Sequence, residues 1–215
     1  MRVFSNTAIS VGGKISTHLN ERIGLGSAED LRRMSLLRAT ADALIVGGRT
    51  FRNWPIPHIE NPAHFDTPPK RKSKLINAVL TRRGLSEANP KRWPHPDVDL
   101  MVFGPETLES QTHQDRFGAE LIQTAVPTIG WVLDVLKNRG CQTVIIEGGG
   151  DIIFQAIESN RLDEMFITIC PTIIGGTSSP SMVSGLGFPA DKMRKLTLVS
   201  SEPIGDEIFL HYRIQ

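Results

Sequence analysis

In two segments of this chain, a run of glycines stands directly between an apolar strand and a helix. One is TVIIEGGGDIIF, from Thr143 to Phe154, and the other is DALIVGGRTF, from Asp42 to Phe51. Apolar runs of this kind predict buried strands, as in a parallel sheet covered by helices. No G-x-G-x-x-G follows the first strand, so the chain lacks the fingerprint of the common dinucleotide-binding fold.

Strand and helix patterns alternate through the middle of the chain, and strand patterns end it. Ser27 is expected to cap a helix that runs to about Thr40, with Asp30 as the acid of a capping box and Leu31 in its apolar stripe. The expected strands are 3–9, 43–46, 75–80, 100–103, 120–122, 143–146, 165–170, 196–201 and 207–214. The other expected helices are 49–53, one from 106 onwards, 128–137 and 151–159, and the longest loops are 10–26, 54–74 and 171–189. This order predicts a single α/β domain over residues 1–215, with a mostly parallel central sheet flanked by helices and an antiparallel C-terminal edge.

Composition excludes several classes of function. The formal net charge is +1, which argues against a dedicated nucleic-acid or membrane-surface binder. No apolar run approaches the roughly 18 residues of a membrane span, and the N-terminus lacks the apolar region of a signal peptide, so a cytoplasmic protein is expected. The two cysteines lie far apart and the six histidines are scattered, so neither a disulfide framework nor a metal site is expected.

The glycine turns favour phosphate binding. Glycine lets the backbone approach a ligand closely, and the N-terminus of the following helix offers free N–H groups to an anion. Two such turns, at Gly47 and at Gly148–Gly150, suit the two phosphates of a dinucleotide, and Thr50 adds a hydroxyl. Arg82, which follows a strand in VLTRRG, has the charge to pair with the extra phosphate of NADPH. The alternatives are ordinary tight turns and a solvated basic turn.

Three charged side chains are candidates for substrate binding. Glu147 ends a strand beside the glycines, where a carboxylate is costly unless it is paired or binds a ligand. A carboxylate there suits the N–H edge of an aminopyrimidine. Asp30 has either a helix-capping or a site role, and Arg38 either holds a substrate phosphate or belongs to a charged helix face.

Together these residues resemble the riboflavin-biosynthesis pyrimidine reductases, which share the dihydrofolate-reductase fold. The resemblance covers most of the chain, and its matching pieces are Asn6–Ile15, Glu29–Thr50, Val79–Arg82, Ile146–Gly150, Arg161–Met165 and Pro171–Gly176. It implies that NADPH delivers a hydride to the ribose C1′ of a ribosylaminopyrimidine 5′-phosphate, so that the ribosylamino group becomes ribitylamino. It also implies a homodimer.

The resemblance assigns residues to the two ligands. Around the substrate it places Asn6, Ser27, Asp30, Arg38 and Glu147. Around NADPH it places Gly47, Thr50, Thr81, Arg82, Gly148, Gly149, Gly150, Asp151 and Ile152. The reaction also needs a proton, and Asp30, Glu147 and a held water are the open candidates for its source.

Two departures from the family pattern bear on the substrate. Gly12 replaces an acid in S-V-G-G-K, and Arg52–Pro55 read R-N-W-P where many members have A-D-D-P. The zinc deaminase signature that is fused to many bacterial members is absent, which predicts a stand-alone reductase domain and leaves open whether the substrate is the diamino or the deaminated pyrimidine. Two other functions remain: a reductase of a pterin or another small carbonyl or imine, and a non-catalytic relative that binds the dinucleotide.

Overall fold

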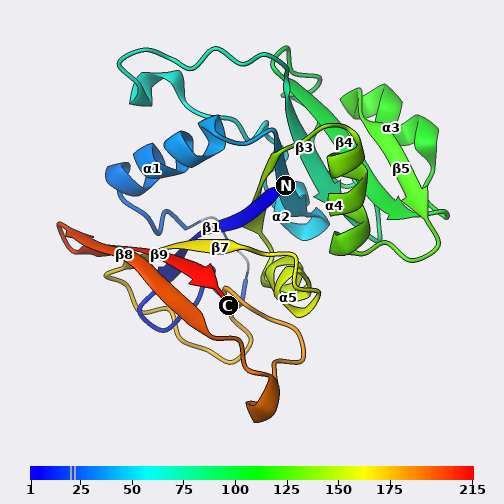
Figure 1. Ribbon diagram of the computed structural model, residues 1–215. Helices are drawn as coiled ribbons and strands as arrows, with labels where there is room; N and C mark the ends of the chain where they lie inside the picture. The colour runs from blue at the N-terminus through cyan, green and yellow to red at the C-terminus, as the bar shows by residue number, and fades with distance from the viewer. Residues whose placement is uncertain (20, 22) are drawn as a thin grey trace.

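A computed structural model describes residues 1–19, 21 and 23–215, with the side chains of 110 and 111 left aside, and shows one sheet with helices on both faces (Figure 1). The strands are β1 (Arg2–Ser10), β2 (Ala43–Gly47), β3 (Leu75–Leu80), β4 (Val98–Pro105), β5 (Glu120–Thr124), β6 (Thr143–Gly148), β7 (Glu164–Cys170), β8 (Leu196–Ile204) and β9 (Glu207–Ile214). The helices are α1 (Ala28–Ala39), α2 (Gly48–Asn53), α3 (Ser110–Phe117), α4 (Ile129–Asn138) and α5 (Gly150–Glu158), with short 3-10 turns η1 (Pro62–His64) and η2 (Ala190–Lys192).

The sheet has nine strands in the order β5-β4-β3-β2-β6-β1-β7-β9-β8. The strands from β5 to β7 in this order pair in parallel, whereas β9 runs antiparallel to both β7 and β8. The predicted α/β fold, with its mostly parallel sheet and antiparallel C-terminal edge, is therefore confirmed. The loop predicted at residues 10–26 includes positions 20 and 22, which lie outside the described residues.

Each face of the sheet has its own hydrophobic core. One core joins α4 and α5 to the sheet through side chains such as Leu133 and Ile153. On the other face, Phe51 of α2 and Phe117 of α3 belong to a second core, together with Phe4 of β1 and buried residues of the neighbouring strands. All five residues of β2 are buried, as expected for a central parallel strand between two helical layers.

Helix α1 differs from its prediction in which residues it buries. Leu31, predicted in the apolar stripe, is 47% exposed, whereas Asp30 and Ser35 are buried. The capping-box prediction is wrong as well, because the Ser27 backbone N–H donates to the Glu207 carboxylate of β9. The Ser27 hydroxyl does cap the helix, since it accepts from the N–H groups of Glu29 and Asp30. The buried side of α1 is thus polar, which is typical of a helix that borders a site.

Local hydrogen bonds determine the start of α3 and the position of residues 54–74. The helix expected from residue 106 begins only at Ser110, because the Leu108 N–H donates to the Pro105 carbonyl and forms a turn first. The excursion of residues 54–74 is held to β3 by Asn77, whose side chain bonds both backbone groups of His58. None of the described helices is long and apolar enough to cross a membrane.

Candidate active site

The site lies at the carboxyl ends of the three neighbouring strands β2, β6 and β1. Their register brings Val46 of β2 beside Gly148, and Ser5 of β1 beside Ile146. Both glycine turns therefore open on the same edge of the sheet. A cavity of about 1,220 Å³ extends from this edge between α1, α2, α5 and the loops around them. Ligands of parallel sheets bind at this kind of edge, outside the carboxyl ends of the strands.

The cavity brings together nearly all the residues that the sequence singled out. Its lining includes Asn6, Asp30, Arg38, Gly47, Thr50, Thr81, Arg82, Glu147, Gly148, Gly149, Gly150, Asp151 and Ile152. Ser27 is the exception within the described part of the chain. It lies at the N-terminus of α1 and bonds Glu207 instead.

The glycines allow the turns to pack closely on each other and on the neighbouring loop. A Cβ on Gly148 would lie 3.1 Å from the Thr50 side chain, and one on Gly150 would lie 2.3 Å from the Ser181 carbonyl oxygen. The N-cap residue of α5 is Gly149, which has no side chain to cap the helix and has the positive φ of 84° that a glycine adopts easily. This bare end of α5 faces the cavity and fits the phosphates of a dinucleotide.

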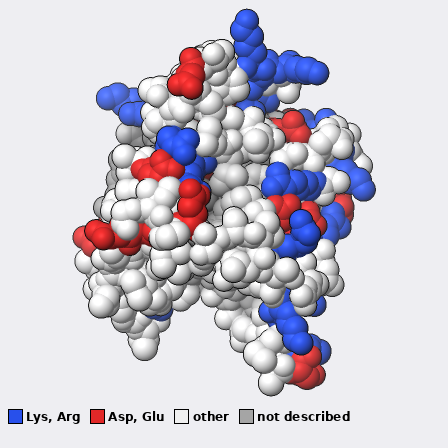
Figure 2. Space-filling model, turned by 60° about the vertical axis from the view of Figure 1, so that its left-hand side comes forward, with Lys and Arg blue, Asp and Glu red and all other residues white. Residues whose placement is uncertain are grey.

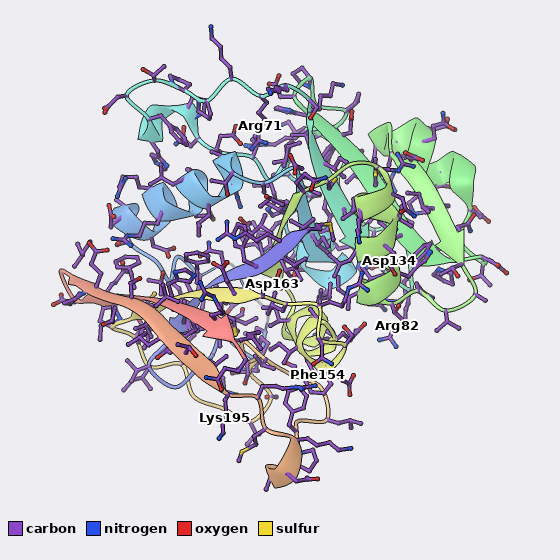
Figure 3. The ribbon with its side chains drawn as sticks, in the orientation of Figure 1. Arg71, Arg82, Asp134, Phe154, Asp163 and Lys195 are labelled. Carbon is purple, nitrogen blue, oxygen red and sulfur yellow. The ribbon has the colours of Figure 1, made fainter. Side chains whose placement is uncertain are left out.

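Four arginines line the cavity near Thr81: Arg49, Arg52, Arg82 and Arg83. Arg52 is half-buried and donates to the Thr81 hydroxyl and the Gly84 carbonyl. Burial lowers the pKa of Arg52, and the nearby charges of Arg83 and Arg49 lower it further, while Glu87 opposes them. Arg82 is exposed just beyond the end of β3, as Figure 3 shows, far from Arg71 on the excursion. This part of the site is therefore positively charged.

The same cavity holds a paired arginine and glutamate. The Nε and Nη2 atoms of Arg38 donate to the two carboxylate oxygens of Glu147 at 2.8 and 2.6 Å. Nη1 of Arg38 donates to the Ile59 carbonyl. Burial alone would lower the pKa of Arg38, but the Glu147 charge and hydrogen bonds, with the charge of Glu60, raise it. Arg38 thus has few donors left for a substrate phosphate, and its main role is to orient Glu147.

His58 borders the same pair and was not singled out by the sequence. Its side chain is buried, and Nδ1 lies 3.5 Å from Nη2 of Arg38. Burial lowers the pKa of His58 to about 4, with a further contribution from the Arg38 charge. Nε2 has no hydrogen-bond partner among the described residues. The charge of Glu147 and the backbone of Trp54 oppose the lowering of the His58 pKa. His58 is therefore a neutral group in the wall of the cavity.

A second carboxyl group of the cavity, that of Asp30, lies where α1 meets β7 and β9. Burial raises the pKa of Asp30, and the charges of Glu207 and Glu147 raise it further, against a hydrogen bond from Thr168. A Cβ on Gly26 would lie only 2.0 Å from Oδ2 of Asp30, so the carboxyl group packs directly on that glycine.

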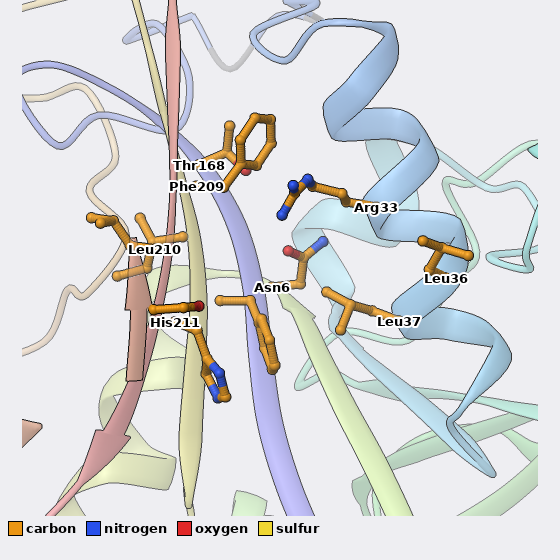
Figure 4. A pocket seen from close by; sticks show the side chains of 11 residues that line it. Asn6, Arg33, Leu36, Leu37, Thr168, Phe209, Leu210 and His211 are labelled. Carbon is orange, nitrogen blue, oxygen red and sulfur yellow. The ribbon is translucent and has the colours of Figure 1, made fainter. Parts of the chain in front are cut away.

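A second, smaller cavity of about 200 Å³ lies between α1 and the C-terminal strands (Figure 4). Asn6 lines both cavities. The guanidinium of Arg33 lies over the Phe209 ring, 4.2 Å from its centroid, and the His211 ring stacks on Phe166 at 4.1 Å. Of the two cavities, the larger one joins the glycine turns to the carboxyl groups of Glu147 and Asp30, so it is the candidate active site.

The amino-acid sequence of the chain matches a known protein family. The model of the RibD C-terminal domain matches residues 1–210. The chain belongs to the RibD C-terminal domain family. The domain has the dihydrofolate-reductase-like α/β fold expected from the resemblance, and the named relatives are reductases of riboflavin biosynthesis.

Three relatives illustrate how far this RibD C-terminal domain resembles others. The 2,5-diamino-6-ribosylamino-4(3H)-pyrimidinone 5′-phosphate reductase of Archaeoglobus fulgidus is 27% identical over 220 residues, which are 95% of this chain and 94% of that protein. A pyrimidine reductase-like protein of Corynebacterium diphtheriae has a TM-score of 0.73 at 22% identity, covering all of this chain and 92% of that one. RibD of Acinetobacter baumannii has a TM-score of 0.72 at 19% identity, and this chain spans 58% of its length.

The two departures from the family pattern lie in different surroundings in this RibD C-terminal domain. Arg52, Asn53 and Trp54 line the cavity, so R-N-W-P changes the site itself. Gly12 is exposed, is not among the described lining residues, and a Cβ there would meet no atom within 4 Å.

Two residues of the site escaped sequence reasoning. His58 stands alone in a proline-rich loop, and Glu207 begins a strand after a turn. Neither belongs to a motif or a helical pattern. His58 reaches the cavity because residues 54–74 are bound to Asn77 of β3. Glu207 reaches the border of the cavity because β9 pairs with β7.

Proposed function

We propose that this protein is an NADPH-dependent reductase that converts the ribosylamino group of a pyrimidine 5′-phosphate intermediate of riboflavin biosynthesis to ribitylamino. The observation that carries the proposal is that one cavity joins two kinds of residue. Glycine turns and four arginines line it, together with the Glu147 carboxylate held by Arg38. The name of the Archaeoglobus fulgidus relative supports the same reaction.

The residues near the arginines fit the cofactor. When bound, NADPH supplies a hydride equivalent to the acceptor carbon. The Gly148–Gly150 turn and the end of α5 would hold its phosphates, with Gly47, Thr50, Thr81, Asp151 and Ile152 around them. Arg82 would pair with the 2′-phosphate, because its guanidinium is exposed and lines the cavity.

The residues near α1 fit the substrate. Glu147 is fixed by Arg38, so its remaining lone pairs can accept from the N–H edge of an aminopyrimidine. Asn6 adds an amide on the floor formed by β1. The walls exclude water from the acceptor carbon and align it, which is the main contribution that a protein makes to hydride transfer. We assign Ser27 a supporting role, since it holds the N-terminus of α1.

We also propose that residues 1–215 act as one domain, that the protein works in the cytoplasm, and that it forms a homodimer through its C-terminal strands. Cys141 and Cys170 are free and buried, which suits a reducing compartment. All residues of β8 are exposed, and large apolar side chains on β8 and β9, such as Leu198, Val199 and Ile208, face solvent. Figure 2 shows that much of the lower part of this side of the molecule carries no charged side chain. An apolar surface of this kind is typical of an interface.

The buried Asp30 keeps the pterin alternative open, because a carboxyl group on this helix suits a pterin as well as a pyrimidine. We would incubate the protein with NADPH and, separately, the diamino ribosylaminopyrimidine phosphate, its deaminated counterpart and dihydrofolate, and follow NADPH absorbance. Oxidation with either ribosylamino compound supports the proposal and identifies the substrate. Oxidation with dihydrofolate alone indicates a pterin reductase, and tight NADPH binding without oxidation indicates a non-catalytic relative.

A further inference from the structure

Arg52 of α2 joins the two ends of the loop that carries Arg82. This loop runs from Thr81 to Gly84 directly after β3, and its two end residues are buried. Arg82 and Arg83, between them, are exposed. Nη1 of Arg52 donates to the Thr81 hydroxyl at 3.3 Å and to the Gly84 carbonyl at 3.0 Å. A single nitrogen atom from the neighbouring helix therefore bridges the base of the loop.

The Thr81 hydroxyl extends this bridge within the loop. It donates to the Gly84 carbonyl at 3.3 Å and accepts from the Arg83 backbone N–H at 3.2 Å. A Cβ on Gly48, which begins α2, would lie 2.4 Å from Oγ1 of Thr81 and 3.1 Å from Nη1 of Arg52. Glycine leaves the room that both groups need at this point. The start of α2 is thus packed so that Arg52 and Thr81 can meet.

The bridge also brings positive charges together beside the glycine turns. All four arginines of this region line the same cavity as those turns. Burial lowers the pKa of Arg52, and the charges of Arg83 and Arg49 lower it further, while Glu87 opposes them. The Glu87 side chain is largely exposed and lies 3.8 Å from Nε of Arg52, so it offsets these charges only weakly. A cluster of this kind attracts an anion to the cavity.

We propose that Arg52 is a positioning residue that fixes the Thr81–Gly84 loop so that the Arg82 guanidinium meets the 2′-phosphate of NADPH. The inference rests on the proposed function and adds a residue that determines the preference for NADPH over NADH. The Arg52 side chain is only 13% exposed and is bound to the loop, whereas Arg82 is exposed at the cavity. A loop that is held in place before the cofactor binds loses less conformational entropy on binding.

Nucleotide binding tests the proposal through a double-mutant cycle. Isothermal titration gives the Kd of NADPH and of NADH for the wild type, Arg52→Met, Arg82→Ala and the variant that carries both changes. Methionine keeps an apolar stem and removes the guanidinium. Arg52→Met should lower the preference for NADPH about fivefold in the wild type and less than about twofold when Arg82 is already alanine. Equal losses for both nucleotides, or an undiminished effect in the double variant, would overturn the proposal, since Arg52 would then act without Arg82.

Hydrogen exchange tests the loop itself without any nucleotide. The Arg83 backbone N–H is bonded to the Thr81 hydroxyl, and its exchange rate reports how often the loop opens. Arg52→Met should make this N–H exchange several-fold faster than in the wild type. An unchanged rate would overturn the proposal, because the loop would then keep its conformation without the bridge.

Arg116→Met is the matched control. Arg116 donates to the carbonyls of Ser86 and Ala88, just beyond the loop, and is not among the described lining residues. Its loss should change neither the Arg83 exchange rate nor the preference for NADPH. The same changes in this variant as in Arg52→Met would overturn the proposal, because any loosening of the segment would then suffice.

The surroundings of the loop do not depend on Arg52 alone. Directly after the loop, the Leu85 N–H donates to Nε2 of His113 at 3.2 Å. Loss of the bridge should therefore free the loop while the fold persists, and Arg52→Gln, which is neutral and too short to bridge the loop, is the second variant if Arg52→Met does not fold. A wild type that binds neither nucleotide contradicts the proposed function itself. A wild type and an Arg52 variant with the same preference for NADPH contradict this inference alone.

Discussion

Arg38 and Glu147 form two hydrogen bonds with each other in the wall of the cavity. Both side chains are largely buried, 12% and 6% exposed. Each side chain neutralises the charge of the other. A substrate that binds Glu147 therefore meets a carboxylate whose orientation is already fixed, which lowers the entropy lost on binding.

Glu147→Gln should bind NADPH as the wild type does but lose substrate affinity or turnover. It should also lower the free energy of unfolding by about 3 kcal/mol, because Arg38 is left buried without its counter-charge. Substrate kinetics and urea unfolding measure the two effects. Glu60→Gln is the matched control, since Glu60 is a buried carboxylate held in the same way by Arg71 but is not among the described lining residues. It should lose stability and keep kcat/KM, and an unchanged kcat/KM in Glu147→Gln would remove the substrate role.

Arg82→Ala should weaken NADPH binding about tenfold and leave NADH binding nearly unchanged, since one charge-assisted hydrogen bond to the 2′-phosphate is lost. Isothermal titration with both nucleotides measures this. Arg92→Ala removes an exposed arginine that is not among the described lining residues and should change neither affinity. Equal losses for NADPH and NADH in Arg82→Ala would contradict the assignment.

His58 should make the protein less stable as the pH falls. Its pKa is about 4 in the folded protein and 6.5 ordinarily, so the unfolded chain binds more protons between these two values. The stability that a neutral His58 provides is complete above pH 6.5 and is lost as the pH falls towards 4, by about 3 kcal/mol in total. The difference in unfolding free energy between the wild type and His58→Gln should therefore change across this window. A difference that is constant with pH would show that His58 is not buried in its neutral form.

Gly150→Ala should lower the free energy of unfolding by about 2 kcal/mol, because the new methyl group would lie 2.3 Å from the Ser181 carbonyl oxygen. Gly12→Ala is the control, since a Cβ there meets no atom within 4 Å, and its effect should stay within about 0.5 kcal/mol. Thermal unfolding of both variants compares them. Equal stabilities would mean that the loop around Ser181 does not pack on the glycine turn.

Leu198→Glu should convert the proposed homodimer to a monomer, because it places a charge in the exposed apolar surface of β8 and β9. Sedimentation velocity over a range of concentrations measures the change. Lys195→Glu, just before β8 and also exposed, alters charge without touching an apolar side chain and should leave the dimer intact. A wild type that sediments as a monomer at all concentrations would refute the interface.

Much of the fold follows from local patterns. The apolar runs before each glycine turn predicted β2 and β6, and the antiparallel pair at the C-terminus appears as β8 and β9. The exposure of Leu31 and the buried Asp30 on α1 were not predicted, because helical periodicity identifies an apolar face but not a polar face that borders a cavity.

In the candidate site, too, local patterns predicted some features and tertiary packing decided the others. Residues within motifs, such as Glu147 and Thr50, were brought to one cavity as expected. The pairing of Arg38 with Glu147 was not foreseen, since the two are separated by 109 positions and only the packing of α1 beside β6 joins them. Glu207 was missed for the same reason, because its contact with Ser27 depends on the position of β9.

The measurement that tests the account most directly is a titration of the purified protein with NADPH and with NADH, followed by addition of the ribosylaminopyrimidine phosphates. We expect tight NADPH binding, weaker NADH binding, and oxidation of the bound NADPH when substrate is added. Failure to bind either nucleotide would contradict the assignment of the glycine turns and the arginines to a dinucleotide, and with it the proposed reductase.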